Sequence, residues 1–246
     1  MKKALVVDND KLIVKLLSGI LEGQGYSVEK AYGGLEALAK LKQATFDIVF
    51  LDLVMPRVGG DRICKFIRQS PEHAGTRVVI ISAVALEAER KIAELKADAC
   101  IAKAPYPILK ENILKAISSL QDTPAGDKMF FAKEGVHARQ IVHELLFAQR
   151  HFEAILNSMR EAVIELDTEH TITYVNPSAQ AMLGKQEWEL IGRNFIDGFP
   201  SDKAQELTAV LRRLSEAANS TTRDLILNYI DREYSLSFRN VIRDGE

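Results

Sequence analysis

One carboxylate in the sequence, that of Asp52, has a position at which a reactive side chain is expected. Asp52 directly follows the apolar run Ile48–Leu51, which is too short for an ordinary helix and suits a strand buried on both faces of a parallel sheet. Open α/β sheets place their ligand sites at the carboxyl ends of such strands. A carboxylate there is costly unless water, a cation or a hydrogen bond serves it. Asp52 is therefore a candidate chemical site, and a helix cap is its purely structural alternative.

Three further apolar runs also end in a polar residue. The pairs are Ala4–Val7 followed by Asp8, Val78–Ile81 followed by Ser82, and Ala99–Ala102 followed by Lys103. The elements that must position these side chains are thus four buried strands that leave their polar residues at the same end. Helical patterns separate the strands, and this alternation predicts a doubly wound α/β sheet with right-handed crossovers.

The order and spacing of these residues, with the Met-Pro that follows Asp52, resemble the response-regulator receiver family over roughly residues 1–120. The resemblance implies a five-stranded parallel sheet in the order 2-1-3-4-5. It implies that Asp52 attacks a phosphoryl group in line and becomes an aspartyl phosphate. Lys103 would then pair with one phosphoryl oxygen, and the Ser82 hydroxyl would hydrogen-bond another and draw its loop inward.

A divalent cation is expected beside these side chains. Asp8 and Asp52 repel each other unless a cation lies between them. Oxygen ligands together with several waters suit Mg²⁺. The expected metal ligands are Asp8, Asn9, Asp52 and, by the resemblance, the backbone carbonyl of Val54.

Three residues depart from the receiver pattern. Asn9 stands where the family usually has a second acid, so metal affinity should fall. The family usually has a proline directly after the lysine, whereas here Ala104 lies between Lys103 and Pro105. The peptide bond between Lys103 and Ala104 is therefore either trans, with a different loop, or a strained cis bond. Cys100 stands where many receivers carry an aromatic residue that swings inward on activation, so the usual coupling between the hydroxyl and that aromatic is not expected.

The run Asp8-Asn9-Asp10 also fits the Asp-x-Asp start of a phosphatase of the haloacid dehalogenase type. Leu12 occupies the position where that class usually has Thr, and Asp52 would have no role in it. We expect Asp10 to cap the first helix instead.

Composition and charge exclude several other classes. The 246 residues are 47% hydrophobic and 27% charged, which is ample for packed cores, and the formal charge of −2 gives no electrostatic case for nucleic acid. Cys64 and Cys100 form neither a disulfide framework nor a zinc signature, so a reducing cytoplasm is expected. No apolar run approaches the roughly 18 residues needed to span a bilayer. We expect a cytoplasmic chain with no membrane contact of its own.

A polar stretch, residues 122–128, predicts the boundary of a first domain that covers residues 1–121. Residues 129–160 are then expected to form a connecting helix. Its apolar positions are spaced like the seam of a coiled coil over about two and a half heptads. The prediction is a parallel homodimer through residues 141–159, with an amphipathic helix packed on its own domain as the alternative. The seam positions are Ile141, Leu145, Ala148, Phe152, Ile155 and Met159.

The last third, residues 161–246, resembles a PAS sensor domain, an α+β fold with an antiparallel sheet. The runs that carry this resemblance are Asn176-Pro177-Ser178-Ala179, Met182-Leu183-Gly184, Leu190-Ile191-Gly192-Arg193 and Phe199-Pro200. Strands are expected at Val163–Asp167, Ile172–Val175, Arg223–Ile230 and Glu233–Ile242. One more strand would complete the sheet, so we expect the domain to be incomplete, with an output domain beyond residue 246.

The ligand of this PAS domain is unknown. A thiol-adduct flavin needs a nearby cysteine, and both cysteines precede residue 101. Haem usually needs an axial histidine, and His170 falls in an expected turn. Neither group is expected.

The sequence thus predicts a two-component response regulator, with no catalytic domain of its own. Asp52 would accept phosphate from a histidine kinase or phosphotransfer protein and pass the change through the helix to the PAS domain. The alternatives are the N-terminal part of a hybrid sensor histidine kinase and a phosphorylation-silent receiver that serves as an interaction module.

Overall fold

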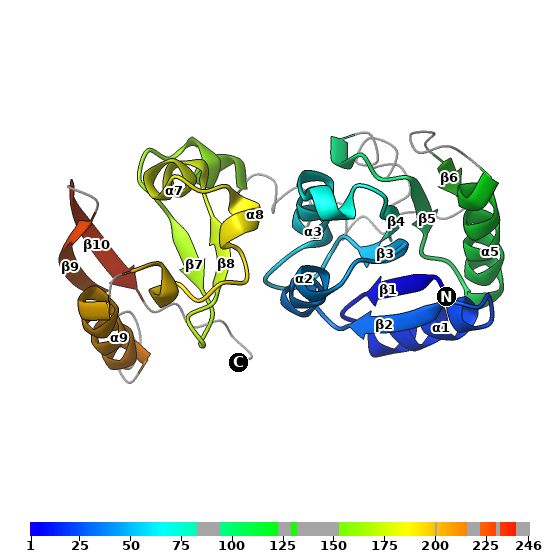
Figure 1. The fold of residues 1–246 in the computed structure, drawn as a ribbon, viewed down its shortest axis with the longest axis horizontal. Helices are drawn as coiled ribbons and strands as arrows, with labels where there is room; N and C mark the ends of the chain where they lie inside the picture. The colour runs from blue at the N-terminus through cyan, green and yellow to red at the C-terminus, as the bar shows by residue number, and fades with distance from the viewer. Residues whose placement is uncertain are drawn as a thin grey trace. The chain divides into compact units, whose positions relative to one another are not determined.

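The computed structural model describes residues 1–82, 94–122, 129–131, 153–199, 201–215, 222–229 and 232–239 (Figure 1). The chain divides into two compact units. The first comprises Met1–Ile164 with Thr173–Gly192, and the second comprises Glu165–Ile172 with Arg193–Glu246.

A parallel sheet forms the centre of the first unit, and its strand order is β2-β1-β3-β4-β5-β6. The order 2-1-3-4-5 expected from the sequence is therefore confirmed for five strands. Four of these strands, β1, β3, β4 and β5, are short and mainly apolar, as expected of strands covered on both faces, whereas β2 at the edge of the sheet has the polar residues Ser27, Glu29 and Lys30. Their bounds are β1 Lys3–Val7, β2 Ser27–Ala31, β3 Ile48–Asp52, β4 Arg77–Ser82 and β5 Ala99–Ala102.

The sixth strand was not expected. β6, Met129–Phe131, pairs in parallel with β5, whereas the sequence pattern placed the start of the connecting helix at residue 129. Apolar and aromatic residues favour strands, and the free edge of β5 offers backbone partners that a helix pattern does not reveal. Residues 141–152, which hold most of the predicted dimer seam, lie outside the described residues.

Helices connect the strands of this sheet. α1 begins after Asp10, whose side chain accepts a hydrogen bond from the backbone N–H of Leu12 and so caps the helix, as expected. The apolar spacing in the sequence predicts helices over Leu86–Ala97 and Ile108–Leu120. The second is α5, which begins two residues earlier than predicted, and the first falls mostly outside the described residues. The bounds are α1 Lys11–Glu22, α2 Gly34–Gln43, α3 Gly60–Gln69, the 3₁₀ turn η1 Pro71–His73 and α5 Tyr106–Asp122.

The last third of the chain forms two small two-stranded sheets with helices beside them. β9 and β10 are antiparallel, with Leu225 opposite Leu236. The predicted strand positions are thus right within one to three residues. The expected closing strand would lie outside the described residues. The bounds are β7 Ile164–Leu166, β8 Ile172–Val175, α7 Pro177–Leu183, α8 Glu187–Leu190, η2 Ile196–Gly198, α9 Ser201–Ser215, β9 Thr222–Tyr229 and β10 Arg232–Arg239.

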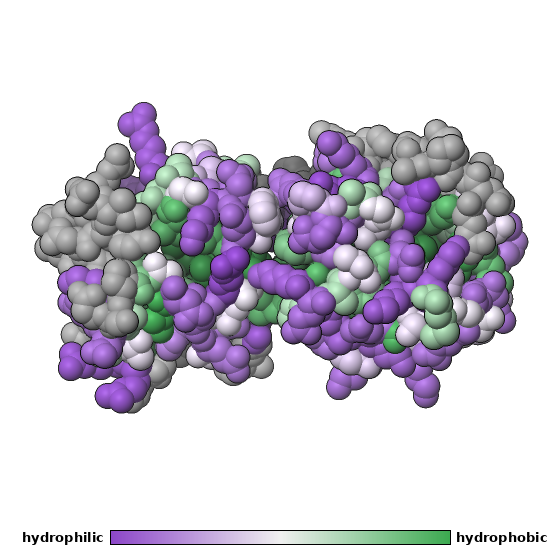
Figure 2. All heavy atoms as spheres, viewed as in Figure 1, coloured by the Kyte–Doolittle hydropathy of each residue, from purple (hydrophilic) through white to green (hydrophobic). Residues whose placement is uncertain are grey.

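Hydrophilic side chains predominate on the face drawn in Figure 2, with apolar ones seen between them. Among the described residues, no helix has both the length and the apolar character that a membrane crossing requires.

Candidate functional site

The parallel sheet brings the predicted site residues to one edge. Asp52 is the last residue of β3 and Ser82 is the last of β4, while Asp8 and Lys103 directly follow β1 and β5. All four strands run in the same direction and are adjacent in the sheet. Their carboxyl ends therefore meet at the same edge, where open α/β sheets hold their ligands.

Lys103 joins the two carboxylates. Its Nζ lies 2.8 Å from Oδ2 of Asp52 and 2.9 Å from Oδ2 of Asp8. Both aspartates are almost fully buried, with 5% and 1% of their surface exposed, whereas a quarter of the lysine side chain is open to solvent. One ammonium thus serves two buried carboxylates, which leaves a surplus of one negative charge.

Backbone N–H groups hold the other oxygen of each carboxylate. Oδ1 of Asp8 accepts a hydrogen bond from the backbone N–H of Asp10 at 2.8 Å. Oδ1 of Asp52 accepts one from the N–H of Val54 at 3.3 Å. These bonds fix the rotation of the two carboxylates, so that both Oδ2 atoms point toward Lys103.

Burial and charge act in opposite directions on this cluster. Burial raises the pKa of Asp52, and the nearby Lys103 opposes that shift, while the charge of Asp8 adds to it. For Lys103, burial alone would lower the pKa, but the two carboxylates outweigh it and raise the pKa. The Lys103 ammonium therefore stays charged, and the cluster has this one cation for two carboxylates.

A close backbone approach shapes the loop after β3. The N–H of Gly60, the first residue of α3, donates to the carbonyl of Leu53 at 3.1 Å. A Cβ at Gly60 would overlap the carbonyl oxygen of Asp52. Only glycine therefore lets α3 begin this close to the backbone of Asp52.

The remaining predicted residues surround the cluster. Ser82 is buried, and its backbone carbonyl accepts a hydrogen bond from the N–H of Lys103 at 2.7 Å. Asn9 is exposed beside Asp8. Among the described residues there is no cis peptide bond, so the bond between Lys103 and Ala104 is trans, the first of the two alternatives.

The donor set suits a hard divalent cation. The two buried carboxylates both point toward the Lys103 ammonium. Among the described residues, that ammonium is the polar group in contact with Oδ2 of Asp8. Oxygen donors with room for water are the ligands that Mg²⁺ prefers. The residues present therefore fit the metal that the sequence implies.

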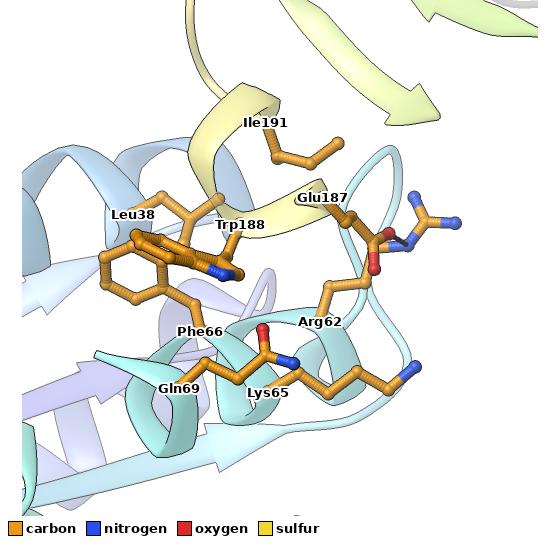
Figure 3. A pocket seen from close by; sticks show the side chains of 8 residues that line it. All are labelled: Leu38, Arg62, Lys65, Phe66, Gln69, Glu187, Trp188 and Ile191. Atoms are coloured by element: carbon orange, nitrogen blue, oxygen red, sulfur yellow. Dashed lines mark ion pairs between the residues drawn. The ribbon is translucent and has the colours of Figure 1, made fainter. Parts of the chain in front are cut away.

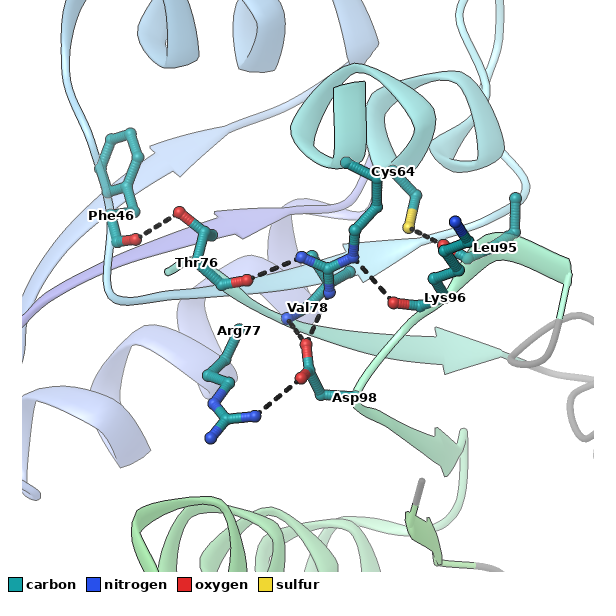
Figure 4. A network of polar contacts seen from close by, with 9 residues as sticks. Phe46, Cys64, Thr76, Arg77, Val78, Leu95, Lys96 and Asp98 are labelled. Carbon is teal, nitrogen blue, oxygen red and sulfur yellow. Dashed lines mark hydrogen bonds and ion pairs between the residues drawn. The ribbon is translucent and has the colours of Figure 1, made fainter. Parts of the chain in front are cut away.

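The opposite edge of the sheet holds a second charged network, which the sequence reading missed (Figure 4). The carboxylate of Asp98 accepts hydrogen bonds from Arg68 (2.6 Å), Arg77 (2.9 Å) and the backbone N–H of Val78 (2.8 Å). Arg68 also donates to the carbonyls of Lys96 and Thr76. Both oxygens of Asp98 accept hydrogen bonds, so this network joins α3 to the starts of β4 and β5.

Figure 3 shows a small pocket in the first unit. Its volume is about 10 Å³, at the lower limit of what one water molecule needs, so no larger ligand fits. An ion pair of 3.2 Å between Arg62 and Glu187 borders it, and burial raises the pKa of that glutamate. The lining residues are Leu38, Arg62, Lys65, Phe66, Gln69, Glu187, Trp188 and Ile191.

Comparison with known families agrees with this geometry. The response regulator receiver domain family matches residues 4–118, and the PAS fold family matches residues 150–241. The chain is a receiver followed by a PAS domain. The strand-end residues Asp8, Asp52, Ser82 and Lys103 all belong to the receiver.

Several relatives share the receiver. The transcriptional regulatory protein ResD of Bacillus subtilis is 39% identical over 88 residues, which are 36% of this chain and 35% of ResD. A putative transcriptional regulator of Haloferax volcanii is 31% identical over 229 residues, which are 85% of this chain and 37% of that protein. The chain thus spans little more than a third of the length of these two relatives.

Solved structures also resemble the receiver. The response regulator TrrA of Thermotoga maritima, in complex with Mg²⁺ and BeF, is 30% identical, and the match covers 47% of this chain and 99% of that one with a TM-score of 0.41.

Proposed function

We propose that this chain is a two-component response regulator whose receiver accepts a phosphoryl group on Asp52 from a histidine kinase or a phosphotransfer protein. The observation that supports this most directly is the shared position of Lys103 Nζ between Asp52 and Asp8. Asp52 stands at a strand end with its carboxylate oriented, partly desolvated and paired with a cation. These are the conditions for a carboxylate nucleophile.

In the proposed reaction an oxygen of Asp52 forms a new P–O bond as the P–N bond of the donor phosphohistidine breaks. The electron pair of that bond stays with the imidazole, which leaves. Lys103 holds one oxygen of the transferred group as a point charge, and Ser82 donates its hydroxyl to another. Water later cleaves the acyl phosphate and regenerates the carboxylate.

The metal ligands in this proposal are Asp8, Asn9, Asp52 and the backbone carbonyl of Val54. When bound, Mg²⁺ supplies positive charge to the phosphoryl oxygens. Asn9 brings an oxygen without a charge, so the affinity for Mg²⁺ is expected to be lower than with an acid at that position.

The phosphoryl group adds negative charge at an edge that already has a surplus of it. Lys103 must then divide its hydrogen bonds between Asp8 and the new oxygens, and Ser82 lies on the neighbouring strand. We propose that the resulting shift of the loops at this edge passes through the connecting helix to the PAS domain. We propose that residues 1–246 act in the cytoplasm as a phosphoacceptor and not as a catalytic domain.

The test is incubation of the full chain with acetyl phosphate and Mg²⁺, followed by mass spectrometry of the intact chain and its peptides. We expect the mass of one phosphoryl group on the peptide that contains Asp52. Asp52→Asn should stay unlabelled. Asp47→Asn is the matched control, because Asp47 precedes the same strand, where it accepts a hydrogen bond from Lys3 at the opposite edge. It should label like the wild type.

Two results would contradict the proposal. The first is a wild-type chain that folds, binds Mg²⁺ and still takes no phosphate, which would favour the silent interaction module. The second is labelling at Asp8 with Asp52→Asn still active, which would favour the phosphatase-like arrangement around Asp8-Asn9-Asp10.

A further inference from the structure

Asn176 occupies an unusual place in the PAS domain, between the end of β8 and the start of α7, and it is fully buried. All four hydrogen-bonding positions of its side-chain amide are in use. Oδ1 accepts from the backbone N–H groups of Val163 and Ala179, both at 2.9 Å. Nδ2 donates to the backbone carbonyls of Leu156 at 3.1 Å and Glu161 at 2.9 Å. An amide can make no more bonds than these.

The two halves of this amide have different tasks. The bond from Oδ1 to Ala179 caps α7, a task that Asp or Ser could also perform. The bonds from Nδ2 reach residues 153–161, which we term the entry segment, because through it the chain enters the PAS domain. Residues 153–158 of this segment are helical. Leu156 lies in the last turn of that helix, and its carbonyl also accepts a hydrogen bond from the backbone N–H of Met159 at 3.3 Å.

Two neighbours of Asn176 contact the same segment. The Oγ of Ser178 donates to the carbonyl of Met159 at 2.7 Å. The hydroxyl of Tyr174 donates to Oδ1 of Asn157 at 3.2 Å. Side-chain donors on three alternate residues, from the end of β8 to the start of α7, therefore hold the entry segment at successive points, and Asn176 is the buried centre of the set.

We propose that Asn176 is a positioning residue that joins the entry segment to the body of the PAS domain, so that movement of one is transmitted to the other. A cap alone needs only the acceptor oxygen. The two donor bonds, made by a side chain with no solvent exposure, are what a joint between two backbone segments requires. The inference rests on the proposed function in one respect, since phosphorylation of Asp52 is the signal taken to reach the entry segment.

The test separates the two halves of the amide in the full chain. Asn176→Asp keeps the oxygen that caps α7 but replaces both donors by a carboxylate oxygen facing two carbonyls. Hydrogen exchange should then speed up roughly tenfold or more in the entry segment, while α7, Pro177–Leu183, keeps its wild-type protection. Ser158→Ala is the matched control, because the Ser158 hydroxyl bonds only within the segment, to the carbonyl of Ile155.

An Asn176→Asp chain with wild-type exchange in the entry segment overturns the proposal. If α7 and the entry segment both lose protection in Asn176→Asp, the Ser178→Ala variant shows whether the side-chain bonds hold the segment. It removes the hydrogen bond from Ser178 to the carbonyl of Met159 and leaves the cap of α7 in place. That variant should speed exchange in the segment by a smaller factor with α7 intact. No change in the segment would overturn the proposal.

The coupling is tested with the phosphorylated chain. Acetyl phosphate with Mg²⁺ should change the exchange of both the entry segment and α7 in the wild type, and of the segment alone in Asn176→Asp. If Asp52 takes up phosphate and α7 responds equally in both chains, the joint is not the route and the inference fails. If Asp52 takes up no phosphate, the proposed function fails, and the comparison of the unphosphorylated chains still decides whether the joint exists.

Discussion

The two edges of the receiver sheet hold charged clusters of opposite balance. At the carboxyl edge, one ammonium, Lys103, serves two buried carboxylates, Asp8 and Asp52. At the amino edge, one carboxylate, Asp98, receives two guanidinium groups and a backbone N–H. The first cluster has one cation for two carboxylates, whereas in the second both oxygens of the single carboxylate are paired with donors, two of them cations.

This difference separates chemistry from structure. A fully paired buried network contributes rigidity, and removing one partner leaves the others desolvated and unpaired. A cluster with more carboxylates than cations is stabilised when a further cation binds to it. The balance of charge, and not the mere presence of buried charge, marks the functional edge.

The largest effect is expected at the paired edge. Asp98→Asn should lower the free energy of unfolding by about 2–3 kcal/mol, because the new amide N–H₂ would face a guanidinium group and both arginines lose their carboxylate. Urea unfolding measures this. Phosphorylation of Asp52 by acetyl phosphate should stay within about twofold of wild type. A comparable loss of phosphorylation would show that the two edges are not independent.

Removing the shared cation should have the next largest effect. Lys103→Met leaves two buried carboxylates facing each other and should cost about 1–2 kcal/mol at neutral pH. Burial and the charge of Asp8 already raise the pKa of Asp52, and without Lys103 this shift is no longer opposed by the ammonium, so the folded state binds more protons than the unfolded state. The loss is therefore present above the unfolded pKa values and shrinks as the pH falls. Urea midpoints across the acidic range check this sign, and a loss that grows on acidification would contradict it.

The same change from Asp to Asn should have the opposite sign at the carboxyl edge. Without divalent cations, Asp8→Asn should stabilise the fold by about 0.5–1 kcal/mol, because it removes the surplus negative charge. Its phosphorylation should nevertheless fall by roughly tenfold or more. Added Mg²⁺ should raise the thermal midpoint of the wild type and have less effect on this variant. A destabilised Asp8→Asn chain would show that this edge is as fully paired as the other.

The smallest effect concerns the cysteines. Burial raises the pKa of the Cys64 and Cys100 thiols to about 12, so the folded chain should react slowly with a thiol reagent at pH 8. Cys64 donates its thiol to the carbonyl of Leu95, beside the paired network. Its labelling should therefore be faster in Asp98→Asn than in Asp8→Asn. Equal labelling in the two variants would mean that neither edge opens independently.

The sequence was sufficient to predict the first five strands of the receiver sheet and the polar residues at the ends of four of them. Short apolar runs followed by Asp, Ser and Lys carry both signals at once, because a buried parallel strand and its functional end are adjacent along the chain. The cap at Asp10 could be predicted for the same reason, since capping depends on residues three or fewer apart.

Interactions between distant residues could not be predicted in this way. Asp98 accepts a hydrogen bond from Arg68, which precedes it by 30 residues in the sequence. A single Asp in a sequence gives no sign of the residues that it will contact. β6 has three residues and exists because β5 lies beside it. Asn176 stands in one of the runs that carry the PAS resemblance, yet its donor bonds reach residues that precede it by 15 and 20 positions, which no local pattern indicates.

β6 also changes the place from which the polypeptide leaves the receiver. α5 returns the chain to the amino edge and ends at Asp122, and β6 then carries it forward again over about 10 Å, parallel to β5. Phe131 is paired with Ile101, which precedes Lys103 by two residues. The departing chain therefore starts one strand away from Lys103, the residue proposed to hold the phosphoryl group. A displacement of Lys103 can therefore affect the outgoing polypeptide through the single ladder of backbone hydrogen bonds between β5 and β6, without transmission along a helix.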